Sequence, residues 1–95
     1  MSFLVRENPA KHRFEILVDD ALAAFTAYIP RGEVLVFTHT EVEQRFRDMG
    51  VGSALIRGTL DQIRERGVRV VPQCPFMAAF IDRHPEYADL VLAVA

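Results

Sequence analysis

A glycine-containing segment between an apolar run and an amphipathic run constrains the fold of this chain more than any other feature. The apolar run covers residues 34–39, the segment covers residues 44–55, and Gly50 and Gly52 stand where the amphipathic run begins. The first N–H groups of a helix lack intrahelical acceptors and lie at the positive end of the helix dipole. Glycine also lets a ligand approach the backbone closely. The sequence therefore predicts an anion site of the phosphate type at this junction.

The spacing of the two glycines argues against two common nucleotide-binding loops. A Walker A loop is excluded because no Gly-Lys-Ser or Gly-Lys-Thr follows. A dinucleotide fingerprint is a poor match, because Leu55 stands where its third glycine belongs and the glycines do not follow the strand directly. The pattern present is Arg47-x-x-Gly50-x-Gly52. An ordinary helix start with two turn glycines is the alternative interpretation.

The chain before the loop has the period of strands. The predicted strands cover residues 3–7, 13–18, 22–29 and 34–39. In the second of them, Phe14, Ile16 and Val18 share one face. Turn residues such as Asn8-Pro9 and Asp19-Asp20 separate the runs. Short turns between consecutive strands predict an antiparallel meander.

The period changes to that of a helix after the loop. The residues that share one helical face are Gly52, Leu55, Ile56, Thr59, Leu60 and Ile63. Gly67 ends this helix, and residues 68–71 form a fifth predicted strand. A strand–helix–strand crossover makes the fourth and fifth strands parallel.

A second, shorter helix is predicted over about residues 76–83, because Pro75 suits its first turn and Pro85 ends it. Phe76, Ala79, Phe80 and Arg83 would share a face, with both phenylalanines in the core. The apolar run within residues 87–95 has no assigned structure. The predicted fold class is α+β: a mostly antiparallel sheet with a central strand–helix–strand unit, parallel fourth and fifth strands and a short C-terminal helix.

Composition bounds the classes of function. The 95 residues allow one domain, expected to span residues 1–95, with 51% apolar and 25% charged residues. The formal net charge is −2, and the absence of a basic run with aromatic residues argues against nucleic-acid binding. Cys74 is the only cysteine, so an intrachain disulfide is impossible. We see no leader segment, membrane-length apolar run or metal-ligand spacing, and expect a cytoplasmic protein.

Several segments together resemble a known family. The segments cover residues 36–42, 50–55, 70–76 and 84–89, and the loop pattern resembles the acetyl-CoA pyrophosphate loop of the GNAT superfamily of N-acetyltransferases. The chain is most similar to the small, single-domain GNAT-like branch. The resemblance implies transfer of an acetyl group from acetyl-CoA to a primary amine. The chain lacks the helices after the first strand and the final hairpin of larger GNAT enzymes, so the acceptor is left open.

The resemblance also implies where acetyl-CoA binds. Backbone N–H groups of the loop would hold its pyrophosphate, and the pantetheine arm would lie between the fourth and fifth strands. The residues expected to bind acetyl-CoA are Thr40, Glu41, Val42, Arg47, Asp48, Met49, Gly50, Val51, Gly52 and Ser53.

The resemblance also implies three candidates for catalysis. Glu41, placed just past the fourth strand, would accept the amine's proton, and a solvated loop or helix-start glutamate is the alternative. His39 would orient Glu41 or line the pocket, or would be structural. Cys74, before a helix start, would take the acetyl group covalently, or would be a small buried residue in the thioester pocket. Tyr87 would protonate the departing CoA thiolate, or would pack against the sheet.

Three functions follow from this interpretation. The first is an N-acetyltransferase whose partners are acetyl-CoA and an amine acceptor, with no nucleic acid and no membrane. The second is an acyl-CoA-binding module with little turnover, and the third is a domain that keeps only the fold. A monomer or a homodimer is expected.

Overall fold

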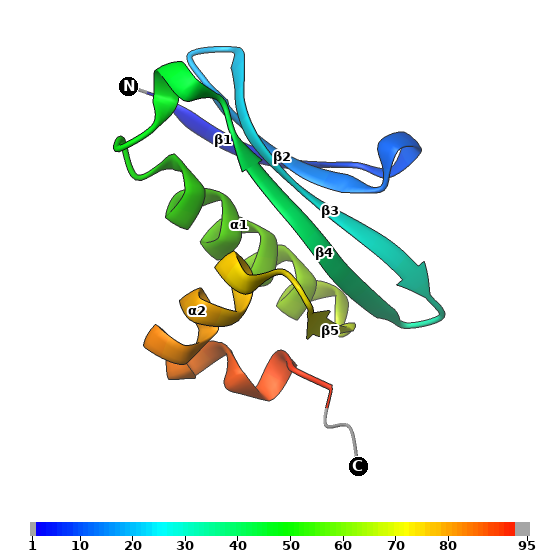
Figure 1. The fold of residues 1–95 in the computed structure, drawn as a ribbon. Coiled ribbons are helices and arrows are strands. Elements are labelled where there is room, and N and C mark those ends of the chain that lie inside the picture. Colours follow the sequence, from blue (N-terminus) through cyan, green and yellow to red (C-terminus); the bar gives the residue numbers. More distant parts are fainter. Residues whose placement is uncertain (1, 93–95) are drawn as a thin grey trace.

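The computed structural model describes residues 2–92 and contains one five-stranded sheet with two α-helices (Figure 1). The strands are β1 (Phe3–Asn8), β2 (Arg13–Val18), β3 (Ala21–Arg31), β4 (Val34–Val42) and β5 (Arg69–Pro72). The helices are α1 (Val51–Arg66) and α2 (Pro75–Arg83), with short 3₁₀ turns at Pro9–Lys11, Gln44–Phe46 and Pro85–Leu90. The strands lie in sequence order, antiparallel except for the parallel pair β4–β5. The predicted α+β class is confirmed.

Tight turns made of residues that tolerate positive φ produce this meander. Asp19 and Asp20 join β2 to β3 with φ of 48° and 71°, and Gly32 joins β3 to β4 with φ of 64°. Two-residue turns with positive φ match the right-handed twist of the strands on either side. The turn residues in the sequence therefore fix both the direction and the register of the strands.

Both helices cover the same face of the sheet (Figure 1). Phe14, Ile16 and Val18 of β2 pack into one core with Leu55, Ile56, Leu60 and Ile63 of α1 and Met77 and Phe80 of α2. The predicted apolar face of β2 and the predicted stripe of α1 are therefore confirmed. Within residues 2–92 neither α-helix lies over the other face, which we call the open face.

Strand β4 is longer than predicted and has an extra residue. It continues to Val42, so Glu41 lies within the strand and not past its end. The register passes from Tyr28↔Phe37 to Ala27↔His39, which leaves Thr38 as a β-bulge. Pairing with β5 stops at Phe37, whereas pairing with β3 continues to Val42. The outer half of β4 therefore has a paired edge and an edge that faces a gap.

The buried face of α2 differs from the predicted one. Met77, Phe80 and Ile81 are buried, whereas Phe76 is 40% exposed and Ala79 is exposed. The first turn of α2 lies beside the beginning of α1, so Phe76 projects toward Gly52 and not into the core. The prediction that Phe76 is a core residue is wrong, and the prediction for Phe80 is confirmed.

The segment after α2 is tied to α1 by polar contacts. Tyr87 is buried, and its hydroxyl donates to Asp61 at 2.7 Å. Arg64 donates to both carboxylate oxygens of Asp89, at 2.8 and 2.9 Å. Val91 then forms a single parallel bridge with Val70 of β5. The C-terminal apolar run thus continues the sheet edge, and residues 93–95 lie outside the described residues. In the described part of the chain, no helix has the length and apolar character needed to cross a membrane.

Gly58 tests the contact between α1 and β1. A Cβ at this position would lie 2.7 Å from Val5 Cγ2 and 2.8 Å from Val5 Cβ. We expect G58A to lower the free energy of unfolding by about 1–3 kcal/mol, because overpacking outweighs the gain of about 1 kcal/mol in helix propensity. Urea denaturation of G58A, V5A and the double variant measures this. The double variant should be more stable than the sum of the single effects, and simple additivity would contradict the contact.

Candidate active site

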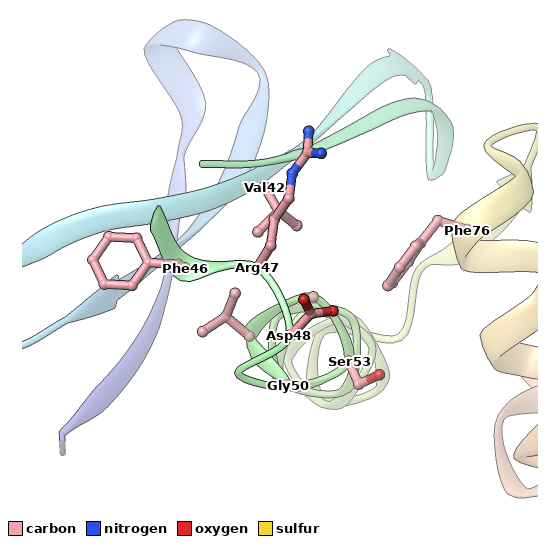
Figure 2. Close-up of a pocket in the computed structure, with 9 residues that line it drawn as sticks. Val42, Phe46, Arg47, Asp48, Gly50, Ser53 and Phe76 are labelled. Carbon is pink, nitrogen blue, oxygen red and sulfur yellow. The ribbon is translucent and has the colours of Figure 1, made fainter. Parts of the chain in front are cut away.

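A cavity of about 400 Å³ lies where β4, the loop after it and the two helix starts meet (Figure 2). Its lining combines backbone of the loop with two aromatic rings and is formed by Val42, Phe46, Arg47, Asp48, Gly50, Val51, Gly52, Ser53 and Phe76. Figure 2 shows Phe76 facing the loop residues across this space. Seven of the ten predicted acetyl-CoA-binding residues line the cavity; Thr40, Glu41 and Met49 do not.

The beginning of α1 presents unpaired backbone donors to this cavity. Its N-cap is Gly50, which has no side chain to accept from the first turn, and that turn contains no acidic residue. The first intrahelical bond is donated by the Ala54 N–H to Gly50 C=O, at 3.1 Å. The N–H groups of Val51, Gly52 and Ser53 therefore precede the hydrogen-bonded part of the helix. Such a helix start favours an anion.

The loop backbone is held in conformations that most residues avoid. Gly50 has φ of 76°, and Asp48 has φ of 64° without being a glycine. At Gly52, a Cβ would lie 2.7 Å from Cζ of Phe76. The two glycines thus serve different purposes: Gly50 permits the turn into the helix, and Gly52 permits the approach of the Phe76 ring. Asp48, like Asp19 and Asp20, is of a residue type that tolerates positive φ, and it permits the turn at the rim of the cavity.

Two hydroxyl groups and a thiol contact one another in a line that runs from β3 across β4 to the start of α2. Thr26 Oγ1 and Thr40 Oγ1 lie 2.9 Å apart, and Thr40 Oγ1 lies 3.2 Å from Cys74 Sγ. Cys74 is 3% exposed, and its N–H donates to Phe37 C=O at 2.9 Å, at the point where β5 leaves β4. As predicted from the sequence, Cys74 follows the fifth strand and precedes a helix start. Its thiol faces the helix side of the sheet, together with Thr40.

His39 and Glu41 lie on the open face, on the other side of the same strand. His39 Nε2 is 3.2 Å from Glu41 Oε2, and the side chains are 61% and 62% exposed. The His39 ring packs edge-on against Phe25 with 6.0 Å between ring centroids. The bulge at Thr38 causes this placement, because without the extra residue His39 and Glu41 would face the helices. The predicted pairing of His39 with Glu41 is present.

Tyr87 lies away from the residues that line the cavity. Its hydroxyl donates to Asp61 and accepts from Arg57 Nη1 at 3.2 Å. The pKa of Tyr87 is raised above its usual value. Burial of the ring is the larger cause, and the hydrogen bond to the Asp61 carboxylate is the second. The ring packs against Phe80 with 6.0 Å between centroids. It therefore packs against α1 and α2 and not against the sheet.

Sequence reasoning missed three parts of this site. Phe46 and Phe76 line the cavity, but an isolated aromatic residue carries no signal that distinguishes a cavity wall from the core. The bulge at Thr38 has no sequence signature, since neither glycine nor proline marks it. The third part is Glu15, on the open face, whose alternation with buried apolar residues predicts an exposed side chain. It is instead 3% exposed.

Comparison with a protein-family model assigns the chain to a class. Residues 13–90 match the model described as GCN5-related N-acetyltransferase. The match covers most of the chain, from β2 to the last 3₁₀ turn. This chain belongs to the GCN5-related N-acetyltransferase family. Comparison with curated proteins found no match.

Solved structures share the fold at low sequence identity. A Staphylococcus aureus protein described as a GCN5-like N-acetyltransferase has a TM-score of 0.69 and 19% identity, over 97% of this chain and 90% of that chain. The ribosomal-protein-S18-alanine N-acetyltransferase of Escherichia coli has a TM-score of 0.61 and 18% identity, over 76% and 50%. Ard1 of Thermoplasma volcanium has a TM-score of 0.54 and 25% identity, over 82% of this chain and 55% of that chain. The matched region is about half the length of the last two. Family membership supports acetyltransferase activity in general terms.

The stability of the folded protein at low pH depends in part on Glu15. Burial alone would raise the pKa of this carboxyl, but hydrogen bonds from Arg13, Asn8 and Arg6 outweigh burial and lower the pKa below its ordinary value of 4.5. A lowered pKa in the folded state gives stability that is complete above about pH 4.5 and is lost as pH falls further. We expect E15Q to cost about 2–3 kcal/mol at pH 7 and to flatten the loss of stability between pH 5 and about pH 3.

The measurement is urea unfolding of wild type and E15Q across this pH range. The exposed Glu65 provides the matched control, since E65Q should leave both the stability and its pH dependence unchanged. Equal pH slopes for wild type and E15Q would contradict the role given to Glu15.

Proposed function

We propose that this protein transfers an acetyl group from acetyl-CoA to a primary amine. The observation that carries the proposal is the uncapped start of α1 at a cavity that reaches both edges of the β4–β5 gap. Val42 lines the cavity from the end of β4, and Phe76 lines it two residues after Cys74. A pyrophosphate bound at the helix start would therefore direct the rest of the cofactor molecule toward Thr40 and Cys74.

The pyrophosphate would be held mainly by backbone. The N–H groups of Val51, Gly52 and Ser53 are available at the positive end of the α1 dipole. Arg47 is exposed on the loop and adds a cationic side chain, whereas Asp48 opposes an anion and would contribute through its backbone alone. Phe76 would pack against the apolar part of the ligand.

The pantetheine arm would pair with the free edge of β4. Glu43 N–H donates to Ala23 C=O at 2.8 Å, so Glu43 directs its backbone groups toward β3. Successive residues of a strand alternate in direction, so Thr40 and Val42 direct theirs toward the gap. These are the groups that an amide-containing arm needs, because β5 has already left β4 at Phe37.

We assign the general base to Glu41, helped by His39. A protonated amine has no free electron pair, so it must lose a proton before it attacks the thioester carbon. The ammonium first gives one proton to Glu41, directly or through water, and the neutral nitrogen then forms a bond to the acetyl carbon. As the carbon–sulfur bond breaks, CoA leaves as a thiolate and takes up the second proton that the nitrogen loses, so the atoms and charges balance. The open face places Glu41 beside solvent, from which the amine arrives.

Direct attack fits the surroundings of Cys74 better than a covalent relay does. The thiol is 3% exposed and contacts Thr40, so a second acceptor has little access to a thioester formed on it. We propose that Cys74 forms part of the wall of the thioester pocket. We also propose that Tyr87 fastens the C-terminal segment to α1 through Asp61, in place of acting as the acid for the leaving thiolate.

Charge changes on the loop test the binding mode of acetyl-CoA. R47Q should weaken binding and D48N should tighten it, each by about twofold to fivefold, because each changes one charge near the pyrophosphate. Asn tolerates positive φ as Asp does, so D48N keeps the loop conformation. Calorimetric titration with CoA at low and high salt measures both effects. The matched control is R31Q, at the far end of β3. Equal affinity for all variants, or no binding at all, would contradict the loop as the pyrophosphate site.

Variants of the three candidate residues separate the chemical roles. E41Q should lower kcat by about 10²-fold or more, since it removes the base. C74A should change the rate several-fold at most, and mass spectrometry of the protein mixed with acetyl-CoA should show no adduct on Cys74. Y87F should lower stability by about 1 kcal/mol with little change in kcat. Release of free CoA thiol reports the rates.

Three results of these measurements would change the assignment. A trapped thioester on Cys74 would establish the relay, and a large loss of kcat in Y87F would restore Tyr87 as the acid. Binding of CoA without turnover on any amine would favour an acyl-CoA-binding module.

A further inference from the structure

The open face of the sheet carries an ordered row of side chains from β2 to β4. Arg13 Nε donates to Glu15 at 2.8 Å, and the Arg13 guanidinium carbon lies 4.4 Å from the centroid of the Phe25 ring. Phe25 packs edge-on against His39, and His39 contacts Glu41 at 3.2 Å. The row therefore joins a buried carboxylate and a guanidinium at one end to the proposed base at the other.

Glu15 organises two arginines at its end of this row. Arg13 and Arg6 each donate through Nε, at 2.8 and 3.2 Å, and Asn8 Nδ2 donates at 3.1 Å. Among residues 2–92 the Nη groups of both arginines have no hydrogen-bond partner. A guanidinium bonded through Nε keeps its terminal donors for a second carboxylate, and two such groups side by side favour one. Glu15 is 3% exposed, so it orients the arginines from below and is not itself open to a ligand.

The two ends of the row favour ligand groups of opposite charge. Glu41 at one end attracts an ammonium group, and Arg6 with Arg13 at the other end attracts a carboxylate. Between backbones, Arg13 on β2 lies two strand spacings, about 10 Å, from β4, and Arg6 on β1 lies three, about 14 Å, although the Arg6 side chain reaches back to Glu15 on β2. Phe25 is in register with Glu15 and Glu41 between them, and its ring is covered in part by the Arg13 guanidinium.

We infer that the acceptor is an amine that also carries a carboxylate roughly 7–10 Å from the nitrogen, bound across the open face with its nitrogen at Glu41 and its carboxylate at Arg6 and Arg13. This inference rests on the proposed acetyltransferase function and specifies its acceptor. A free amino acid with a long aminoalkyl side chain has this chemistry, and so does a lysine beside an acidic residue in a polypeptide. Both sources present the same pair of charges at the same separation.

Acceptors of equal chain length isolate the contribution of the carboxylate. We would compare kcat/KM for 6-aminohexanoate, hexylamine and 1,6-diaminohexane by release of free CoA thiol. The carboxylate should raise kcat/KM by about tenfold or more over hexylamine, and the second amine should give no such gain, since it would face two arginines. High salt should reduce the preference, because the Arg6 side chain is 56% exposed and its charge is screened.

Variants of the arginine pair test the same point within the protein. In R13Q and in R6Q/R13Q, the ratio of kcat/KM for 6-aminohexanoate to that for hexylamine should fall toward one. R13Q leaves Glu15 with one guanidinium fewer, so R13Q/E15Q is the second variant, and CoA titration reports whether each variant is folded. R31Q is the matched control, because Arg31 ends β3 about 20 Å along the strand from Phe25, and it should keep the wild-type ratio.

Peptide acceptors distinguish the two sources of the carboxylate. Free lysine is compared with capped peptides in which one lysine is flanked by glutamates or by arginines. A preference for the glutamate-flanked peptide over the arginine-flanked one supports a polypeptide acceptor, and a preference for free lysine over both supports an amino acid. Turnover of hexylamine at the same kcat/KM as all carboxylate-bearing acceptors would overturn the inference and leave the proposed function intact. Absence of turnover on every amine would overturn both.

Discussion

Unequal pairing along β4 is the constraint on which the site depends. Its first half has partners on both edges, β3 and β5, and its second half keeps only β3. The change falls at Phe37, whose C=O accepts a hydrogen bond from Cys74 N–H. The next residue, Thr38, is the bulge in the pairing with β3. One step in the ladder therefore opens an edge for a ligand and reverses which side chains face the helices. Thr40 turns toward Cys74, and His39 with Glu41 turns toward solvent on the open face.

The placement of both helices on one side explains why the two faces of the sheet differ. With 95 residues, two helices are enough to cover one face of a five-stranded sheet and to form one core. The other face must then be stabilised by its own side chains. Glu15 does this by accepting hydrogen bonds from Arg6, Arg13 and Asn8, so the open face carries a buried and hydrogen-bonded charge. This face is also the one on which the proposed amine acceptor would bind.

The sequence predicts features that depend on local pattern and misses those that depend on tertiary register. Alternation in β2, the stripe on α1, the turn residues and the crossover between β4 and β5 were sufficient to predict the sheet order and the helix-covered face. The loop glycines located the cavity, because helix starts and glycines leave marks in sequence. The bulge at Thr38 leaves none, since it is a shift of register against β3 at the point where the pairing with β5 ends.

The error in the buried face of α2 also has a tertiary cause. The buried face of α2 was misjudged because Phe76, an aromatic residue in an amphipathic run, reads as core. Its actual position follows from Gly52, whose missing Cβ leaves room for the ring beside α1. Only contact between segments more than 20 residues apart reveals this, and a hydrophobic period within one segment does not contain that information.

Electrostatics on this chain must act locally for the proposed reaction to occur. The net charge of −2 gives no long-range attraction for an anionic nucleotide, and charges more than about 10 Å apart are largely screened at physiological salt. Attraction has to come from groups within a few ångströms: backbone N–H groups at the start of α1 with Arg47 on the helix side, and Arg6 with Arg13 on the open face. Each set of cationic groups lies next to a carboxylate, Asp48 or Glu15, whose negative charge would cancel the attraction felt by a distant ligand. Because Glu15 is buried and Asp48 lies at the cavity rim, that cancellation weakens at contact range, where the donors themselves touch the ligand. A site of this kind selects its ligands by fit and not by long-range attraction.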